Sequence, residues 1–303
     1  MDPITAIATI TRRGTEVSVE GADDDADFEI GSISKGVTGL LYADALARGE
    51  LQPESTLGEL LPLGDVPVAG VTLASLSIHR SGLPRLPKSA QPWRRTLALW
   101  RHGANPYGES LGELLEQARG VVPAASPRPG YSNFGFELLG HAVAAGAGMP
   151  YAELVRRRLT EPLGLGTCYV PATAAELGPG ALAGRSRSGR PREPWTGEAI
   201  GPAGGIRATI TAMARLATAL LDGSAPGTAA LDPVADLSGR VRIGAAWIVL
   251  RGGGRSVTWH NGGTGGFRSW LGLDRAAGTG VVVLSATTRS VDRRGFESLA
   301  GLG

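Results

Sequence analysis

The sequence predicts an α/β fold in which an antiparallel sheet is built from both ends of the chain and flanked by helices. Two short alternating segments around Arg13-Gly14 predict a hairpin near the N-terminus. Four further strand patterns follow one another near the C-terminus with glycine-rich turns between them, which is typical of an antiparallel meander. The expected strands are 4–11, 15–20, 245–250, 256–260, 268–273 and 280–285.

The middle of the chain has the apolar periodicity of helices, heavily punctuated by proline and glycine. Strands at both ends with helices between them predict one sheet with an inserted, mainly helical lobe. We therefore expect a single unit over residues 1–303, with an α/β lobe made of 1–55 plus 203–303 and a helical lobe made of 56–202. Helical patterns occupy 55–80, 109–119, 134–146, 150–159 and 206–222.

One segment of this middle region lacks helical periodicity. Residues 178–205 are rich in glycine, proline and arginine, and we expect a long loop there. A mobile lid and a plain solvated connection fit this composition equally well.

Bulk properties exclude several classes of function. The formal net charge is only +2, and no basic run interleaved with aromatic residues indicates a nucleic-acid partner. Cys168 is the single cysteine, so no intrachain disulfide forms. The N-terminus has no pattern of an export signal, and no apolar run is long enough to span a bilayer. We expect a cytoplasmic protein with no nucleic-acid and no membrane partner.

Ser32 and Lys35 lie three residues apart at the start of a predicted helix, so their side chains share a face. A serine hydroxyl becomes nucleophilic when a base takes its proton, and a neutral lysine one turn away suits that role. Lys35 is one of two lysines among 30 basic residues, and lysine, unlike arginine, loses its proton when desolvated. Taken alone, the pair still favours an ordinary helix start capped by serine.

Tyr131-Ser132-Asn133 follows a Pro-Gly pair. A phenol beside a cationic lysine ionises more easily and can relay a proton, and an asparagine amide can donate to a substrate carbonyl. Taken alone, this tripeptide is more typical of a turn.

The segment from Trp259 to Phe267 contains His260-Asn261-Gly262-Gly263. Its glycines allow close approach of a ligand to the backbone, and a strand edge bearing His260 offers a backbone N–H to an oxyanion and a side chain to a substrate. A glycine-rich hairpin loop without function is the competing interpretation.

The three motifs, in this order and over nearly the whole chain, resemble those of the class C β-lactamase and penicillin-binding-protein-like serine hydrolases. That family combines S-x-x-K, Y-x-N and a K-T-G-type strand. The resemblance implies a β-lactamase-like fold without cofactor or metal. It further implies that Ser32 is acylated and that Lys35 and Tyr131 share the role of general base.

The resemblance also assigns residues that bind the substrate. Asn133 would hold the acyl portion, and the backbone N–H groups of Ser32 and Gly263 would form the oxyanion hole. His260 and Gly262 would stand where the first and last residues of the K-T-G triplet stand.

Three departures from the family pattern bear on the substrate. His260 replaces the lysine of the triplet and is mostly neutral at pH 7, so it suits the carboxylate of a penicillin-like substrate less well. This favours the esterase, peptidase or transacylase branch. Ser32 also comes early, so the helix that usually precedes the first strand is missing or supplied by another chain. Finally, without an export signal the substrate is expected inside the cell.

These observations leave three functions open. The first is a hydrolase that cleaves a small ester or amide through acyl-Ser32, with a β-lactamase or D-amino-acid peptidase as the alternative. The second is an acyltransferase in which an amine acceptor intercepts the acyl-enzyme, as in relatives that exchange an ester for an amide in antibiotic biosynthesis. The third, least favoured because Ser32, Lys35 and Tyr131 are intact, is a non-catalytic scaffold.

The acceptor site of such an acyltransferase has candidate residues. Trp93, Trp100 and Trp195, together with the arginine-bearing loop, are available to build it, and they fit core and surface positions somewhat better.

Overall fold

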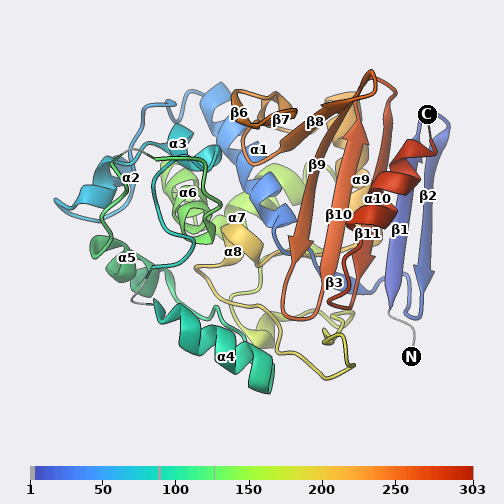
Figure 1. Ribbon diagram of the computed structural model, residues 1–303, viewed down its shortest axis with the longest axis horizontal. Coiled ribbons are helices and arrows are strands. Elements are labelled where there is room, and N and C mark those ends of the chain that lie inside the picture. The colour runs from blue at the N-terminus through green and yellow to red at the C-terminus, as the bar shows by residue number, and fades with distance from the viewer. Residues whose placement is uncertain (1–3, 88–89, 126, 303) are drawn as a thin grey trace.

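The computed structural model describes residues 4–87, 90–125 and 127–302. An eight-stranded antiparallel sheet occupies one side of the molecule, and most of the helices lie on the other side (Figure 1). Its strands run in the order β2-β1-β11-β10-β9-β8-β7-β6. They are β1 (Thr5–Thr11), β2 (Gly14–Glu20), β6 (Ala235–Ser238), β7 (Val241–Ile243), β8 (Ile248–Gly252), β9 (Arg255–Gly263), β10 (Arg268–Asp274) and β11 (Thr279–Ser285).

The two ends of the chain meet in this sheet. β1 pairs antiparallel with β11, with Thr5 opposite Ser285 and Ile10 opposite Gly280. β9, β10 and β11 form the meander that the glycine-rich turns predicted. The predicted fold class is therefore confirmed, with β6 and β7 as additional short strands at one edge.

The helices and short helical turns fill the space between the chain ends. The α-helices are α1 (Ile33–Ala47), α2 (Leu57–Leu60), α3 (Leu73–Ser77), α4 (Pro92–His102), α5 (Leu111–Arg119), α6 (Asn133–Gly146), α7 (Tyr151–Val155), α8 (Gly201–Gly204), α9 (Ile210–Asp222) and α10 (Asp292–Ala300). The other helical turns are η1 (Pro67–Gly70), η3 (Arg156–Thr160), η4 (Ala174–Glu176) and η5 (Thr228–Leu231).

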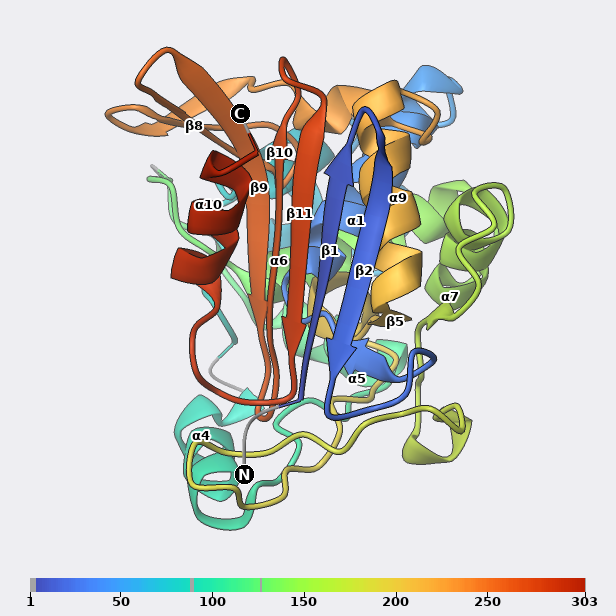
Figure 2. The same ribbon diagram turned by 90° about the vertical axis from the view of Figure 1, so that its right-hand side faces the viewer.

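Helices cover both faces of the large sheet. α9 packs against β1 and β11 on one face, and α10 packs against β10 and β11 on the other (Figure 2). α1 is buried along almost its whole length and lies between the sheet and the helices α6 and α8. This central helix therefore has a fixed position, and so does the residue at its N-terminus, Ser32.

A second, three-stranded sheet lies beside the start of α1. It has the order β3-β5-β4, formed by β3 (Asp27–Glu29), β5 (Arg207–Thr209) and β4 (Cys168–Tyr169). The helix expected over 206–222 consequently begins only at Ile210, because Arg207 belongs to this sheet and forms a buried ion pair with Asp27.

Other expectations from the sequence have mixed outcomes. The segment 178–205 is largely irregular as predicted, with α8 at its end, and its role as a lid stays a prediction. The division into lobes at 55/56 and 202/203 also stays a prediction. In the described part of the chain, no helix combines the length and apolar character that crossing a membrane requires. A cytoplasmic location stays a prediction.

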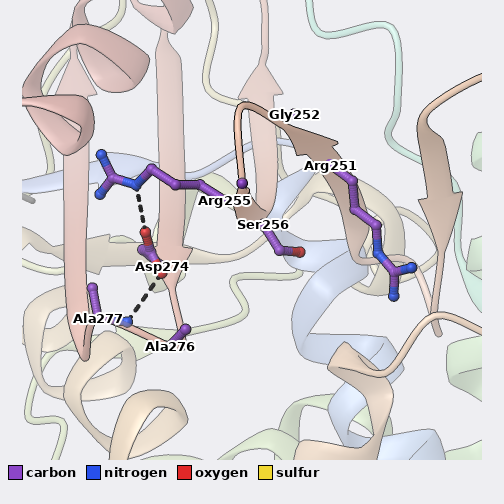
Figure 3. Close-up of a pocket in the computed structure, with 8 residues that line it drawn as sticks. Arg251, Gly252, Arg255, Ser256, Asp274, Ala276 and Ala277 are labelled. Atoms are coloured by element: carbon purple, nitrogen blue, oxygen red, sulfur yellow. Dashed lines mark hydrogen bonds and ion pairs between the residues drawn. The ribbon is translucent and has the colours of Figure 1, made fainter.

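A surface hollow of about 790 Å³ lies at the far end of β9 from Gly263. Figure 3 shows that Asp274 in its wall accepts from Arg255 Nε at 2.9 Å and from the N–H of Ala277 at 3.1 Å, whereas Arg251 points away. Because the Asp274 carboxylate is already paired, it is not a candidate reactive group.

Candidate active site

Ser32 occupies the N-cap position of α1, and its hydroxyl does not cap the helix. Its Oγ instead accepts a hydrogen bond from Tyr131 Oη at 2.6 Å and another from Lys35 Nζ at 3.2 Å. The residue is partly exposed. The ordinary serine cap that this motif favours when taken alone is therefore wrong, and two donors converge on an accessible hydroxyl.

Lys35 is completely buried. Its Nζ donates to the carbonyl of Ala203 at 2.5 Å in addition to its bond to Ser32. Burial lowers the pKa of Lys35, because the charged ammonium loses its hydration. A neutral amine keeps two N–H bonds and one lone pair, so Lys35 can hold its place against Ala203 and still accept the proton of Ser32.

Tyr131 stands with its ring between a histidine and two cations. His79 packs on the ring at a centroid distance of 4.7 Å, Lys35 Nζ lies 4.8 Å from the ring centroid, and the Arg85 guanidinium lies at 5.4 Å. His79 Nδ1 also accepts from the N–H of Ser132 at 3.3 Å. These contacts hold the ring so that its hydroxyl points at Ser32.

Sequence analysis did not identify His79 as a site residue. Burial, followed by the charge of Lys35, lowers the pKa of His79 to about 3. The ring is thus neutral at pH 7, which its role as an acceptor at Nδ1 requires. Its partner residues are about 50 positions away in the chain, so no local pattern reveals it.

The end of β9 packs directly on the turn before Ser32. A Cβ atom on Gly31 would lie 2.6 Å from the Gly263 nitrogen, and Gly31 has a φ of +52°. A Cβ on Gly262 would lie 2.0 Å from the Ile30 oxygen. Within the described residues the N–H of Ser32 has no hydrogen-bond partner. This close approach of two backbones brings the N–H groups of Ser32 and Gly263 together as candidate donors to an oxyanion.

Asn133 is buried at the start of α6. Its Nδ2 donates to Tyr107 Oη at 2.7 Å, and its Oδ1 has no partner among the described residues. Tyr107 in turn packs edge-on against Trp195 at 4.7 Å. The Asn133 amide nitrogen has a second N–H that a substrate carbonyl could accept from, and the role of Asn133 as a substrate contact stays a prediction. Sequence analysis did not identify Tyr107.

His260 is almost completely buried, and its Nδ1 lies 2.7 Å from the Asn261 carbonyl. Because a carbonyl only accepts, Nδ1 carries the hydrogen and Nε2 is free to accept. Burial lowers the pKa of His260 to about 4, so the ring is neutral at pH 7. Together with His79 and Tyr131, whose hydroxyl donates to Ser32, it lines a hollow of about 160 Å³.

Glu137 is a buried carboxyl one turn along α6 from Asn133, and its Oε1 has no partner among the described residues. Burial, and then the nearby charge of Glu109, raises the pKa of Glu137 to about 8. Lys35 and Arg95 act in the opposite direction. This carboxyl therefore holds a proton at neutral pH, although a positive charge on Lys35 would favour its ionised form.

A buried ion network fixes part of the irregular segment 178–205. Arg207 pairs with Asp27 and, at 3.4 Å, with Glu29, and all three side chains are buried. Glu29 Oε1 also accepts from the N–H of Trp195 at 2.8 Å. The network thereby ties the irregular segment that contains Trp195 to β3, which ends three residues before Ser32.

The three tryptophans considered for an acceptor site do not lie together. Trp195 packs beside Tyr107 and reaches within 3.2 Å of where a Cβ of Gly265 would lie. Trp93 and Trp100 are instead 86% and 72% exposed on α4. Of these residues, only Trp195 remains a candidate for contact with a substrate or an acceptor.

A match to known sequences identifies the family of this chain. The family model described as Beta-lactamase matches residues 4–300, which is nearly the entire chain. This chain belongs to the beta-lactamase family. The members and structural neighbours of that family are serine hydrolases, and the assignment agrees with a serine, a lysine and a tyrosine within hydrogen-bond distance of one another.

Curated relatives match parts of this beta-lactamase-family chain. The D-alanyl-D-alanine-carboxypeptidase/endopeptidase AmpH of Escherichia coli is 30% identical over 152 residues, which cover 48% of this chain and 38% of that protein. A beta-lactamase-like protein of Arthroderma benhamiae is 25% identical over 328 residues, covering 94% of this chain and 53% of that protein. The matches thus span only about half or less of the length of these relatives.

Solved structures confirm the fold. A class C beta-lactamase superposes with a TM-score of 0.84 at 19% identity, covering 99% of this chain and 91% of that one. The D-alanine carboxypeptidase AmpC of Burkholderia cenocepacia gives a TM-score of 0.82 at 21% identity, covering 99% and 93%. At these identities the likeness establishes a shared fold and no shared substrate.

Proposed function

We propose that this chain is a serine acyl-transfer enzyme that works through an acyl-Ser32 intermediate on a small ester or amide. The observation that carries the proposal is the convergence of Lys35 Nζ and Tyr131 Oη on Ser32 Oγ, at 3.2 and 2.6 Å. A hydroxyl that has given up its proton carries negative charge, and both donors stabilise that charge.

In the proposed reaction Lys35, Tyr131 or both take the proton of Ser32 as Oγ attacks the acyl carbon. The carbonyl oxygen becomes an oxyanion facing the N–H groups of Ser32 and Gly263 at the N-terminus of α1, where the helix dipole favours negative charge. The bond to the leaving group then breaks, and the leaving group receives the proton. Water or an amine next attacks the acyl-enzyme and restores Ser32.

The neutral residue at one strand position supports an ester or amide as the substrate. The strand position that holds a lysine in the K-T-G pattern is here the buried, neutral His260. A substrate carboxylate would find no cation on that strand residue, whereas an uncharged acyl group loses nothing. The competing candidate is cleavage of a D-amino-acid peptide, because the AmpH relative is a D-alanyl-D-alanine-carboxypeptidase/endopeptidase.

Substrate comparison tests the proposal. We expect turnover of p-nitrophenyl acetate and related neutral esters to exceed that of nitrocefin and of a D-alanyl-D-alanine peptide, in kcat/KM. A peptide or nitrocefin turned over faster than every ester would overturn the ester assignment and favour the peptidase or β-lactamase alternative.

Hydrolase and transacylase are separated by the fate of the acyl group. The same activated ester is supplied with and without a panel of primary amines, and acid and amide products are quantified. Amide formed faster than acid at millimolar amine identifies a transacylase, because it requires an acceptor site that excludes water. Acid alone at every amine concentration identifies a hydrolase.

A further inference from the structure

α4 presents large apolar side chains to solvent. Trp93, Leu97 and Trp100 follow one another at helical spacing and are 86%, 55% and 72% exposed. None of the eleven residues of α4 is fully buried. Exposed tryptophans on one face of a helix are uncommon in a soluble domain and mark a surface that contacts a partner.

The chain segment that contains this face carries a net positive charge, although Glu109 and Glu193 from outside it lie near α4. Residues 66–108 contain six lysines and arginines and no aspartate or glutamate. Arg94 and Arg101 flank the apolar face and are exposed, and neither takes part in an ion pair in the described part of the chain. An apolar face bordered by arginines that form no ion pair is complementary to a surface with an apolar interior and negatively charged headgroups.

The opposite side of α4 attaches the helix to the body of the protein near the active site. Leu99 lies 3.0 Å from where a Cβ of Gly265 would lie, and its carbonyl accepts from Arg192 Nη1. Arg95 pairs with Glu109. Both views place α4 at the lower margin of the molecule (Figures 1 and 2). The exposed face is therefore held outward on an anchored helix.

We propose that the outer face of α4, made of Trp93, Leu97 and Trp100 with Arg94 and Arg101, binds the surface of a bilayer that contains anionic lipid. Tryptophan and leucine on one face with arginine beside them are typical of helices that lie in a membrane interface. The tryptophan rings enter the headgroup region and the guanidinium groups meet lipid phosphates. Docking in this way would bring the turn at Gly265, next to Gly263, close to the membrane.

This proposal does not rest on the acyl-transfer function, and it opposes the expectation of no membrane partner. That expectation came from the lack of an apolar run long enough to span a bilayer. No helix was predicted at 92–102. The structure supplies the helix and shows which of its side chains face outward.

Co-sedimentation of the full chain with vesicles tests the proposal. Vesicles of phosphatidylcholine alone are compared with vesicles containing 30% phosphatidylglycerol, at low and at physiological salt. We expect binding to the anionic vesicles only, weakened by salt. W93A/W100A should lower the partition coefficient at least tenfold, and R94Q/R101Q should lower it roughly 30-fold at low salt.

Matched controls remove equivalent groups elsewhere. V122A/V234A removes two exposed apolar side chains, and R187Q/R251Q removes two exposed arginines. Both should bind vesicles as the wild type does. Unchanged melting temperatures and unchanged ester turnover in solution show that every variant is folded.

Three results would overturn the proposal. The first is no sedimentation of the folded wild type with anionic vesicles. The second is equal binding by W93A/W100A and the wild type, which would leave only nonspecific charge attraction. The third is a wild-type dimer in the absence of lipid that W93A/W100A converts to a monomer, because the face would then belong to a second copy of the chain.

Discussion

Replacing Tyr131 by phenylalanine removes a single oxygen from the centre of the proposed site. The ring keeps its packing on His79 at 4.7 Å and its place beside Lys35 at 4.8 Å, while the 2.6 Å hydrogen bond to Ser32 is lost. Tyr131 is 38% exposed, so one lost hydrogen bond should cost only about 0.5–1.5 kcal/mol of unfolding free energy.

The expected effect of this change on catalysis is much larger. A group that transfers the proton of the nucleophile contributes about 10²–10⁴-fold, which is roughly 3–5 kcal/mol of barrier at 1.36 kcal/mol per tenfold change. We therefore predict that Tyr131→Phe slows acylation by that factor and barely changes the melting temperature. The measurement is the rate of the p-nitrophenol burst or of fluorophosphonate labelling, with thermal unfolding of the same samples.

A matched control is Tyr169→Phe. The Tyr169 hydroxyl also donates a hydrogen bond, to Asp27 Oδ2 at 3.0 Å, but it lies away from Ser32 on β4. This variant should acylate at the wild-type rate. If folded Tyr131→Phe acylates within about threefold of the wild type, the phenol is not part of proton transfer and the assignment of Lys35 and Tyr131 as joint bases is refuted.

Three further changes probe other parts of the site. Gly31→Ala places a Cβ 2.6 Å from the Gly263 nitrogen and should slow acylation about 10²–10³-fold. Gly49→Ala, at another glycine with positive φ but in open space, should not slow it. Equal acylation rates for the two variants would exclude the proposed oxyanion hole. His260→Lys should raise the ratio of the acylation rate with nitrocefin to that with an ester roughly tenfold or more, because it adds a cation. An unchanged ratio would contradict the proposal that the neutral His260 disfavours a substrate carboxylate. The pKa of Glu137 is raised from 4.5 to about 8, so the folded state binds one more proton than the unfolded state between those pH values, and its stability falls as pH rises through them. The melting temperature of Glu137→Gln should therefore rise relative to that of the wild type from pH 5 to pH 8. A constant difference would show that the carboxyl is not buried and protonated.

Elements with a strong apolar repeat were predictable from the sequence. The hairpin β1–β2, the meander β9–β11 and the start of α1 at Ser32 follow from period-2 and period-3.6 patterns around glycine turns. α4 was not predicted, although Trp93, Leu97 and Trp100 recur at helical spacing. The small sheet β3-β5-β4 was missed because its strands have only two or three residues each.

The site shows the same distinction between local and distant partners. Ser32 and Lys35 are one helical turn apart, so their pairing was visible in the sequence. His79, Tyr107 and Glu137 have partners on other elements, and a single sequence does not reveal which of many such residues will meet. Arg207 is the extreme case, because its carboxylate partner Asp27 is 180 residues away.

The most direct test of the account is mass spectrometry of the acyl-enzyme. The folded protein is treated with a fluorophosphonate or with p-nitrophenyl acetate, and the adduct is located by peptide mapping beside a Ser32→Ala control. We expect one adduct per chain on Ser32 and none in the control. An unlabelled Ser32 in folded protein, or the same adduct in Ser32→Ala, would contradict it.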